Sequence, residues 1–171
     1  MSNTLPDIPR LYTALAEWLA CMVYIQALPR RFHGWRMGLW AGAGLAVLPA
    51  FLILTGDLPI GFWLPCMMLG LLAGCCRISP RDAAYYCIHA FVLAEFAASL
   101  EWQLYCFLLL NREASAWMRA GLLVAVYLAV FLLMGGLVRR LSAKGGALEV
   151  TWRELSAAAI IGVAVVALSN L

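Results

Sequence analysis

Long apolar runs alternate with short polar breaks along the whole chain. Six runs each approach the roughly 20 residues that a helix needs to cross about 30 Å of hydrocarbon. Backbone groups in lipid must be paired within the chain, and the runs lack the alternation of barrel strands, so they predict helices. The expected spans are Arg10 to Leu28, Trp35 to Thr55, Leu58 to Cys76, Asp82 to Leu110, Ala116 to Val138 and Trp152 to Leu171. The pattern predicts an all-α fold, a six-helix transmembrane bundle that forms a single polytopic domain over residues 1–171.

Two of the polar breaks carry the chemistry of helix starts. Ser79-Pro80-Arg81-Asp82 offers a capping serine, a proline at the first helical position and an acid in the first turn. Thr151-Trp152-Arg153-Glu154 has the spacing of a capping box, in which threonine and glutamate satisfy each other's backbone amides. These two boundaries therefore rest on more than hydropathy.

Composition places the runs in a membrane. The chain is 65% hydrophobic and 12% charged, with a mean hydropathy of +0.89. This apolar content exceeds the roughly 45–50% of soluble domains. The first nine residues lack a basic region and the first run lacks a cleavage site, so we expect no cleavable signal peptide.

The loop charges predict an orientation, because translocation of basic residues is disfavoured. Nine Lys and Arg follow the first, third and fifth expected helices: Arg30, Arg31, Arg36, Arg77, Arg81, Arg139, Arg140, Lys144 and Arg153. Only three lie on the opposite side: Arg10, Arg112 and Arg119. We expect both termini outside and the basic loops in the cytoplasm, against anionic lipid. The net charge of +3 reflects this bias and does not indicate nucleic acid as a partner.

Small residues four apart predict close contacts between helices, since helices in lipid associate where backbones can approach. The expected seams are Gly38-Gly42-Ala46, Gly70-Gly74 and Gly121-Ala125-Ala129. The six cysteines lie within or at the ends of spans, and we expect them to pack as small apolar side chains. Neither cysteines nor histidines have metal-ligand spacing, so no disulfide, metal or cofactor is expected.

Three acids, Glu17, Glu95 and Glu101, fall inside expected membrane spans. An acid at the centre of a membrane helix costs about 2.5 to 3.5 kcal/mol, so these groups should face the bundle interior and be protonated or partnered. Glu95 and Glu101 point roughly 120° apart, at about 100° per residue, which predicts that the fourth helix is central. Glu17 and Glu101 both lie a few turns from the outer end, where they could line an outward-facing pocket.

The candidate residues for ligand binding or signalling are therefore Glu17, Glu95, Ser99, Glu101 and Trp102, with Trp18 as a second aromatic wall. Arg112 and Arg119 are candidate counter-charges. The alternative is structural: Glu17 and Glu101 hydrogen-bond to neighbouring side chains or backbone and fix the packing. No P-loop, GxGxxG, HExxH or GxSxG motif occurs, and His89 is expected to be a packed imidazole, so no catalytic residue is assigned.

Three stretches carry a family resemblance: LPDIPRLYTALAEW (Leu5 to Trp18), ISPRDA (Ile78 to Ala83) and AFVLAEFAASLEWQL (Ala90 to Leu104). Together they resemble the multi-pass membrane input region of GHKL-type sensor histidine kinases of Gram-positive gut bacteria. The strongest motif, AEFAASLEWQL, contains Glu95, Glu101 and Trp102. The resemblance implies a sensory module in the bacterial plasma membrane that detects a small-molecule or peptide signal, and it is compatible with a homodimer.

The family's further parts would follow residue 171: a seventh helix, a cytoplasmic pair of signalling helices and an ATP-binding domain. The chain given lacks the phosphoacceptor histidine and the nucleotide-binding motifs, so whether it belongs to an enzyme stays open. Its last residues, Leu168 to Leu171, resemble the start of the next extracellular loop. The expectation is an input module truncated before its kinase, or a stand-alone relative of one.

Two other functions stay open. Six helices in a chain of this length are similar to the substrate-binding components of energy-coupling-factor vitamin transporters, but those keep both termini in the cytoplasm. No inverted repeat of the kind found in secondary transporters is visible. A structural membrane partner without a ligand would have all three glutamates satisfied inside the fold.

Overall fold

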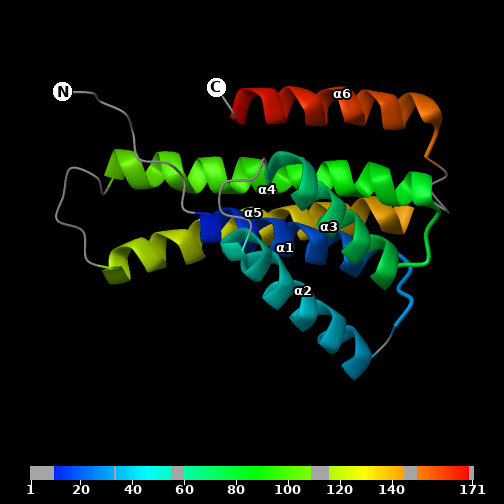
Figure 1. The fold of residues 1–171 in the computed structure, drawn as a ribbon, viewed down its shortest axis with the longest axis horizontal. Coiled ribbons are helices and arrows are strands. Elements are labelled where there is room, and N and C mark those ends of the chain that lie inside the picture. The colour runs from blue at the N-terminus through cyan, green and yellow to red at the C-terminus, as the bar shows by residue number, and fades with distance from the viewer. Residues whose placement is uncertain (1–9, 33, 55–59, 109–115, 145–149, 170–171) are drawn as a thin grey trace.

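The computed structural model describes residues 10–32, 34–54, 60–108, 116–144 and 150–169. Within these ranges the chain forms six helices and no strand, which confirms the all-α prediction (Figure 1). The helices are α1 (Arg10–Ala27), α2 (Trp35–Leu54), α3 (Ile60–Cys75), α4 (Pro80–Leu108), α5 (Ala116–Lys144) and α6 (Trp152–Ser169). The fifth helix passes the expected end at Val138, because Arg139 and Arg140 end the apolar run but are good helix formers.

Successive helices run in alternate directions, so the ends of α1, α3 and α5 lie beside the starts of α2, α4 and α6 (Figure 1). Two backbone hydrogen bonds join the turns there: Arg31 N–H donates to Cys75 O at 2.7 Å, and Arg77 N–H to Pro29 O at 2.8 Å. We call this end the basic end; its described arginines are Arg30, Arg31, Arg36, Arg77, Arg81, Arg139, Arg140 and Arg153.

Both expected helix starts have the predicted caps. The Asp82 amide donates to the Ser79 hydroxyl at 3.2 Å. The Glu154 amide donates to Thr151 Oγ1 at 3.3 Å, while the Thr151 amide donates to the Glu154 carboxylate at 2.8 Å, which closes a capping box. The amide of Val150 also donates to Asp82 at 3.3 Å and so ties the start of α6 to the start of α4.

The fourth helix is central, as the two acids on different faces predicted. It packs against α1, α3, α5 and α6, and its most extensive interface is with α1. This interface is built from alanine: Ala16 and Ala20 on α1 and Ala90, Ala94 and Ala97 on α4 are all fully buried. The short side chains let the two helix backbones approach closely.

Most glycines of the expected seams make no close contact within the described chain, except Gly74, where an added Cβ would lie 4.0 Å from the Trp40 ring. A Cβ added at Gly38, Gly42, Gly70 or Gly121 would meet no described atom within 4 Å, so these positions face open space. Close approach occurs instead at Gly162 on α6, where a Cβ would lie 3.0 Å from Ile88 Cγ2 of α4. Spacing of four residues fixes a face of a helix but does not identify the face that meets a neighbour.

Two described stretches are long and apolar enough to cross a membrane: Pro80–Leu108 and Trp117–Arg140. The second has a mean hydropathy of 2.5, yet only 22% of it is buried inside the protein. Its exposed side chains include Leu132 and Leu133, each 70% exposed. The length and apolar composition of these two helices support association with a membrane.

Candidate functional site

The carboxyl group of Glu17 is enclosed at the centre of the bundle. Glu17 lies on the face of α1 that carries the buried residues Ala14, Ala20 and Cys21, and its own side chain is 0% exposed. Neither Oε1 nor Oε2 has a hydrogen-bond partner among the described residues. Buried polar groups are nearly always hydrogen-bonded, so a carboxyl group without a partner calls for a functional explanation.

Glu95 and Glu101 both lie on α4, the helix that packs most extensively against α1. Glu95 is half-buried there. Glu101 is 1% exposed and its Oε2 has no hydrogen-bond partner in the part of the chain described. Glu17 and Glu101 are therefore enclosed inside the bundle, whereas Glu95 is only partly buried.

Tyr127 of α5 is a further buried polar residue that was not predicted from the sequence. It is 3% exposed. Its hydroxyl donates to the Tyr12 carbonyl oxygen of α1 at 2.8 Å. The signal available in the sequence was a single tyrosine in the middle of the otherwise apolar run from 120 to 138.

The predicted aromatic walls lie elsewhere. Trp18 Nε1–H donates to the Ala41 carbonyl oxygen at 2.8 Å, so this ring faces α2. Trp102 stacks on Tyr105 with ring centroids 5.0 Å apart. The guanidinium of Arg119, a predicted counter-charge, lies 5.1 Å from the Tyr105 ring centroid in a cation–π contact.

The remaining predicted site residues differ in how far they are buried. Ser99 and Trp102 are half-buried on α4, whereas Glu17 and Glu101 are fully enclosed. Arg112 lies outside the described residues. The structure therefore encloses Glu17 and Glu101 and leaves the other three candidate residues partly exposed.

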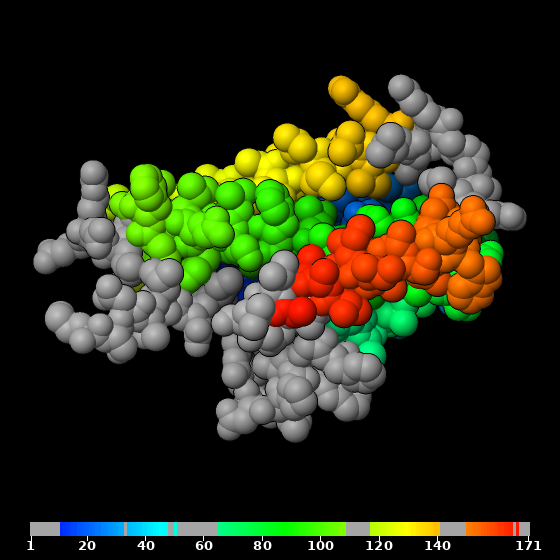
Figure 2. All heavy atoms as spheres, turned by 90° about the horizontal axis from the view of Figure 1, so that it is seen from above, coloured from blue at the N-terminus to red at the C-terminus, as the bar shows by residue number. Residues whose placement is uncertain are grey.

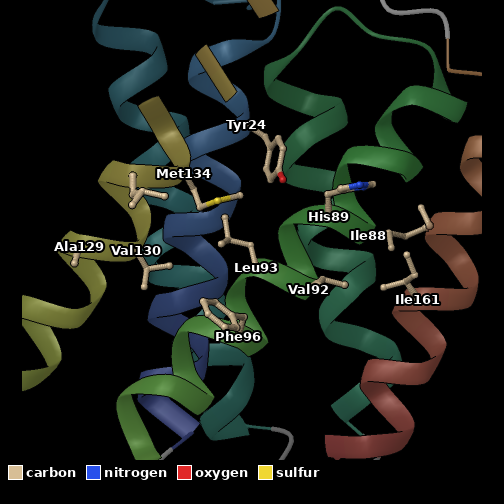
Figure 3. Close-up of a pocket in the computed structure, with 12 residues that line it drawn as sticks. Tyr24, Ile88, His89, Val92, Leu93, Phe96, Ala129, Val130, Met134 and Ile161 are labelled. Atoms are coloured by element: carbon tan, nitrogen blue, oxygen red, sulfur yellow. The ribbon is translucent and has the colours of Figure 1, made fainter. Parts of the chain in front are cut away.

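Two apolar grooves flank this acidic centre on either side of α5. The α5–α6 groove has a volume of about 600 Å³ and is floored by Val92 and Leu93 of α4 (Figure 3). Met134 and Val130 of α5 face Ile161 of α6 across it (Figure 3). In the space-filling view α5 and α6 form separate ridges beside α4 (Figure 2).

Polar groups are sparse in the α5–α6 groove. Tyr24 and His89 supply them, at the same end of the groove (Figure 3). His89 Nδ1–H donates to the Tyr85 carbonyl oxygen at 3.0 Å, and its ring lies 4.2 Å from that of Tyr85. This hydrogen-bonded, packed imidazole matches the expectation for His89.

The α1–α5 groove has a volume of about 460 Å³ and lies between the two helices named. Its lining includes Leu15, Leu19 and Val23 of α1 and Tyr127, Leu128, Phe131, Leu132, Gly135 and Gly136 of α5. Gln26 and Arg139 close it at the basic end. None of the five predicted site residues is among the described residues that line either groove.

The six cysteines form no disulfide bonds in the structure. All six thiols are free, and Cys21, Cys75, Cys76 and Cys87 are buried. The Cys87 thiol lies 3.3 Å from the Pro65 carbonyl oxygen, to which it donates. Among the described residues no three His, Cys, Asp or Glu side chains are placed to hold a metal ion.

Comparison with known proteins gives no relative: no protein-family model, curated protein or solved structure matches the chain. Any functional conclusion therefore rests on the residues and their geometry.

Proposed function

We propose that this chain is a multi-pass membrane bundle that serves as the sensory input module of a bacterial two-component histidine kinase. In this proposal it detects an extracellular or membrane-borne signal and transmits it to a cytoplasmic kinase encoded after residue 171. The observation that carries the proposal is the carboxyl group of Glu17, fully enclosed and without a described hydrogen-bond partner. The family resemblance of the AEFAASLEWQL segment adds the sensory role.

A membrane setting is supported by the side chains on the outside of the bundle. Leu128, Leu132, Ile160 and Val163 are each at least 55% exposed. Large contiguous apolar surfaces are rare on soluble monomers and common where lipid or a partner covers them. Alternate helix directions also bring the turns with nine basic residues to one end, the arrangement expected when basic loops stay in the cytoplasm.

The acidic centre supplies a place where a signal could change the packing. Ionisable groups inside a membrane protein are costly to keep, so their retention favours a functional role. Glu17 lies on α1, Glu101 on α4 and Tyr127 on α5, so a change in the bonding of any one of them alters contacts among three helices. A signal shifts the balance between two packings only by its difference in affinity for them.

The topology is tested with reporters fused after the first residues and after the last residue of the chain. We expect both termini outside and the turns of the basic end in the cytoplasm. Termini that are both cytoplasmic would contradict the orientation and would favour a transport component. Recovery of the chain in the aqueous fraction would contradict membrane insertion itself.

The sensory role is tested in the native gene product. An in-frame histidine kinase domain downstream of Leu171 is expected, and its autophosphorylation in membrane vesicles provides the readout. Glu101→Gln should change the autophosphorylation rate, whereas Gln103→Asn, on the exposed face of the same helix, should not. Equal rates in well-inserted Glu101→Gln, Glu17→Gln and wild type would refute a signalling role for the acids.

A further inference from the structure

The α1–α5 groove has the length of one lipid leaflet. Its lining on α1 runs from Leu15 to Gln26. At 1.5 Å per residue these 11 steps cover about 16 Å, close to half of the roughly 30 Å hydrocarbon core. The groove therefore follows α1 from its second turn to the basic end.

Glycine opens the groove close to its polar end. A Cβ added at Gly135 or Gly136 of α5 would meet no described atom within 4 Å. Both residues line the groove one turn before Arg139. The missing side chains leave room for an apolar chain where it would pass from the hydrocarbon toward its head group.

Two positive charges converge at that end of the groove on a neutral residue. The guanidinium of Arg139 donates to the side-chain oxygen of Gln26, and the guanidinium of Arg30 donates to the Gln26 backbone oxygen at 3.2 Å. All three residues are exposed. A guanidinium has five N–H donors, so both arginines keep donors for an anion.

We propose that the α1–α5 groove binds an anionic phospholipid of the surrounding leaflet, with one acyl chain along α1 and α5 and its phosphate held by Arg139 and Arg30. Arginine matches phosphate geometry with paired hydrogen bonds, and the apolar walls match the chain. The proposal rests on the membrane insertion in the proposed function and is independent of the kinase. The lining of this lipid site includes Tyr127 but none of the three glutamates.

The charge match distinguishes this groove from its neighbour. The α5–α6 groove is larger, yet its described lining contains no arginine or lysine, and its polar groups are Tyr24 and His89 (Figure 3). An acyl chain could lie in either groove. Of the two described linings, only that of the α1–α5 groove contains a guanidinium group, that of Arg139. The charge of the lipid head group therefore favours binding in the α1–α5 groove.

The experiment measures lipid retention by the full chain purified in detergent micelles. Dioleoylphosphatidylglycerol or dioleoylphosphatidylcholine is added at equal ratios, and bound lipid is counted by native mass spectrometry. Wild type should retain one phosphatidylglycerol and lose phosphatidylcholine. A photoactivatable phosphatidylglycerol with its reactive group on the acyl chain should label residues 15–26 and 123–139.

Each variant has a matched control on the same helix. Arg139→Gln should weaken phosphatidylglycerol retention at least about tenfold, the effect of losing one hydrogen bond to a charged group, whereas Arg140→Gln should not. Gly135→Leu should block the groove, whereas Ala129→Leu, which projects into the α5–α6 groove, should leave retention unchanged. Because the space at Gly135 is open, Gly135→Leu should keep wild-type helix content by circular dichroism.

Several results would overturn the lipid site. Equal losses in Arg139→Gln and Arg140→Gln would show attraction to the basic end as a whole, without a site. Equal retention of both lipids, or labelling mainly in the α5–α6 groove, would refute the assignment of the head group. Correct topology with no retained phosphatidylglycerol refutes this inference alone, whereas a chain found in the aqueous fraction refutes the proposed function as well.

Discussion

Replacement of Glu17 by methionine should stabilise the bundle against unfolding. Methionine is unbranched, fills irregular space and is a good helix former, so it can occupy the enclosed position on α1 without a hydrogen-bond partner. The carboxyl group it replaces is 0% exposed and has two oxygens without a described partner. The variant therefore removes an energetic cost without removing a described bond.

The size of the effect follows from that cost. A buried polar group left without a hydrogen bond costs about 1–3 kcal/mol. The free energy of unfolding of Glu17→Met should thus rise by about 1–3 kcal/mol, and signalling by the native gene product should be impaired.

Unfolding can be followed by circular dichroism while detergent micelles are titrated with dodecyl sulfate. Gln103→Met is the matched control, because Gln103 is exposed on α4 and its replacement should change the free energy by less than about 0.5 kcal/mol. A loss of stability of 1 kcal/mol or more in Glu17→Met would show that the carboxyl group makes a stabilising bond. That result would refute the reasoning and favour a structural role.

Three further predictions use the same unfolding assay. Tyr127→Phe removes the hydrogen bond to the Tyr12 carbonyl oxygen and should cost about 1 kcal/mol; an unchanged midpoint would argue against that bond. Gly162→Ala places a Cβ 3.0 Å from Ile88, and the overpacking cost of about 1–3 kcal/mol should cancel or exceed the gain of about 1 kcal/mol in helix propensity; a clear rise in stability would mean that the contact is loose. Thr151→Ala removes the cap of α6 and should cost about 1 kcal/mol, with faster amide exchange in the first turn; exchange at the wild-type rate would contradict the capping box.

Local features of the fold were predictable because their causes lie within a few residues. The caps at Ser79 and Thr151 depend on side chains three positions away, and both form as expected. The central position of α4 followed from two acids on different faces, since each needs a protein neighbour in place of lipid. Such arguments need only the geometry of one helix.

Contacts between helices could not be predicted in the same way. Gly38 and Gly70 have the spacing of a seam but face open space, while the alanines of α1 and α4 form the closest interface. Trp18 was expected beside the acids and instead donates to α2. The sequence indicates which face of a helix is small or polar, but the partner depends on how all six helices share the limited space.

The enclosure of two acids was predictable from the sequence, but their mutual arrangement was not. Glu17 and Glu101 were expected to face the interior of the bundle, and both are buried. The position of an acid along its helix can be read from the sequence. The rotation of α1 relative to α4, which decides which side chains meet, cannot. Tyr127 was missed because an isolated tyrosine in an apolar run has no local partner to mark it.

The fifth helix forms a wall of both grooves. Val130 and Met134 line the α5–α6 groove, and Phe131 and Gly135 line the α1–α5 groove from the opposite side of the helix. A molecule bound in one groove affects binding in the other only through a displacement of this shared helix. Thermodynamic linkage then requires the effect to be equal in both directions.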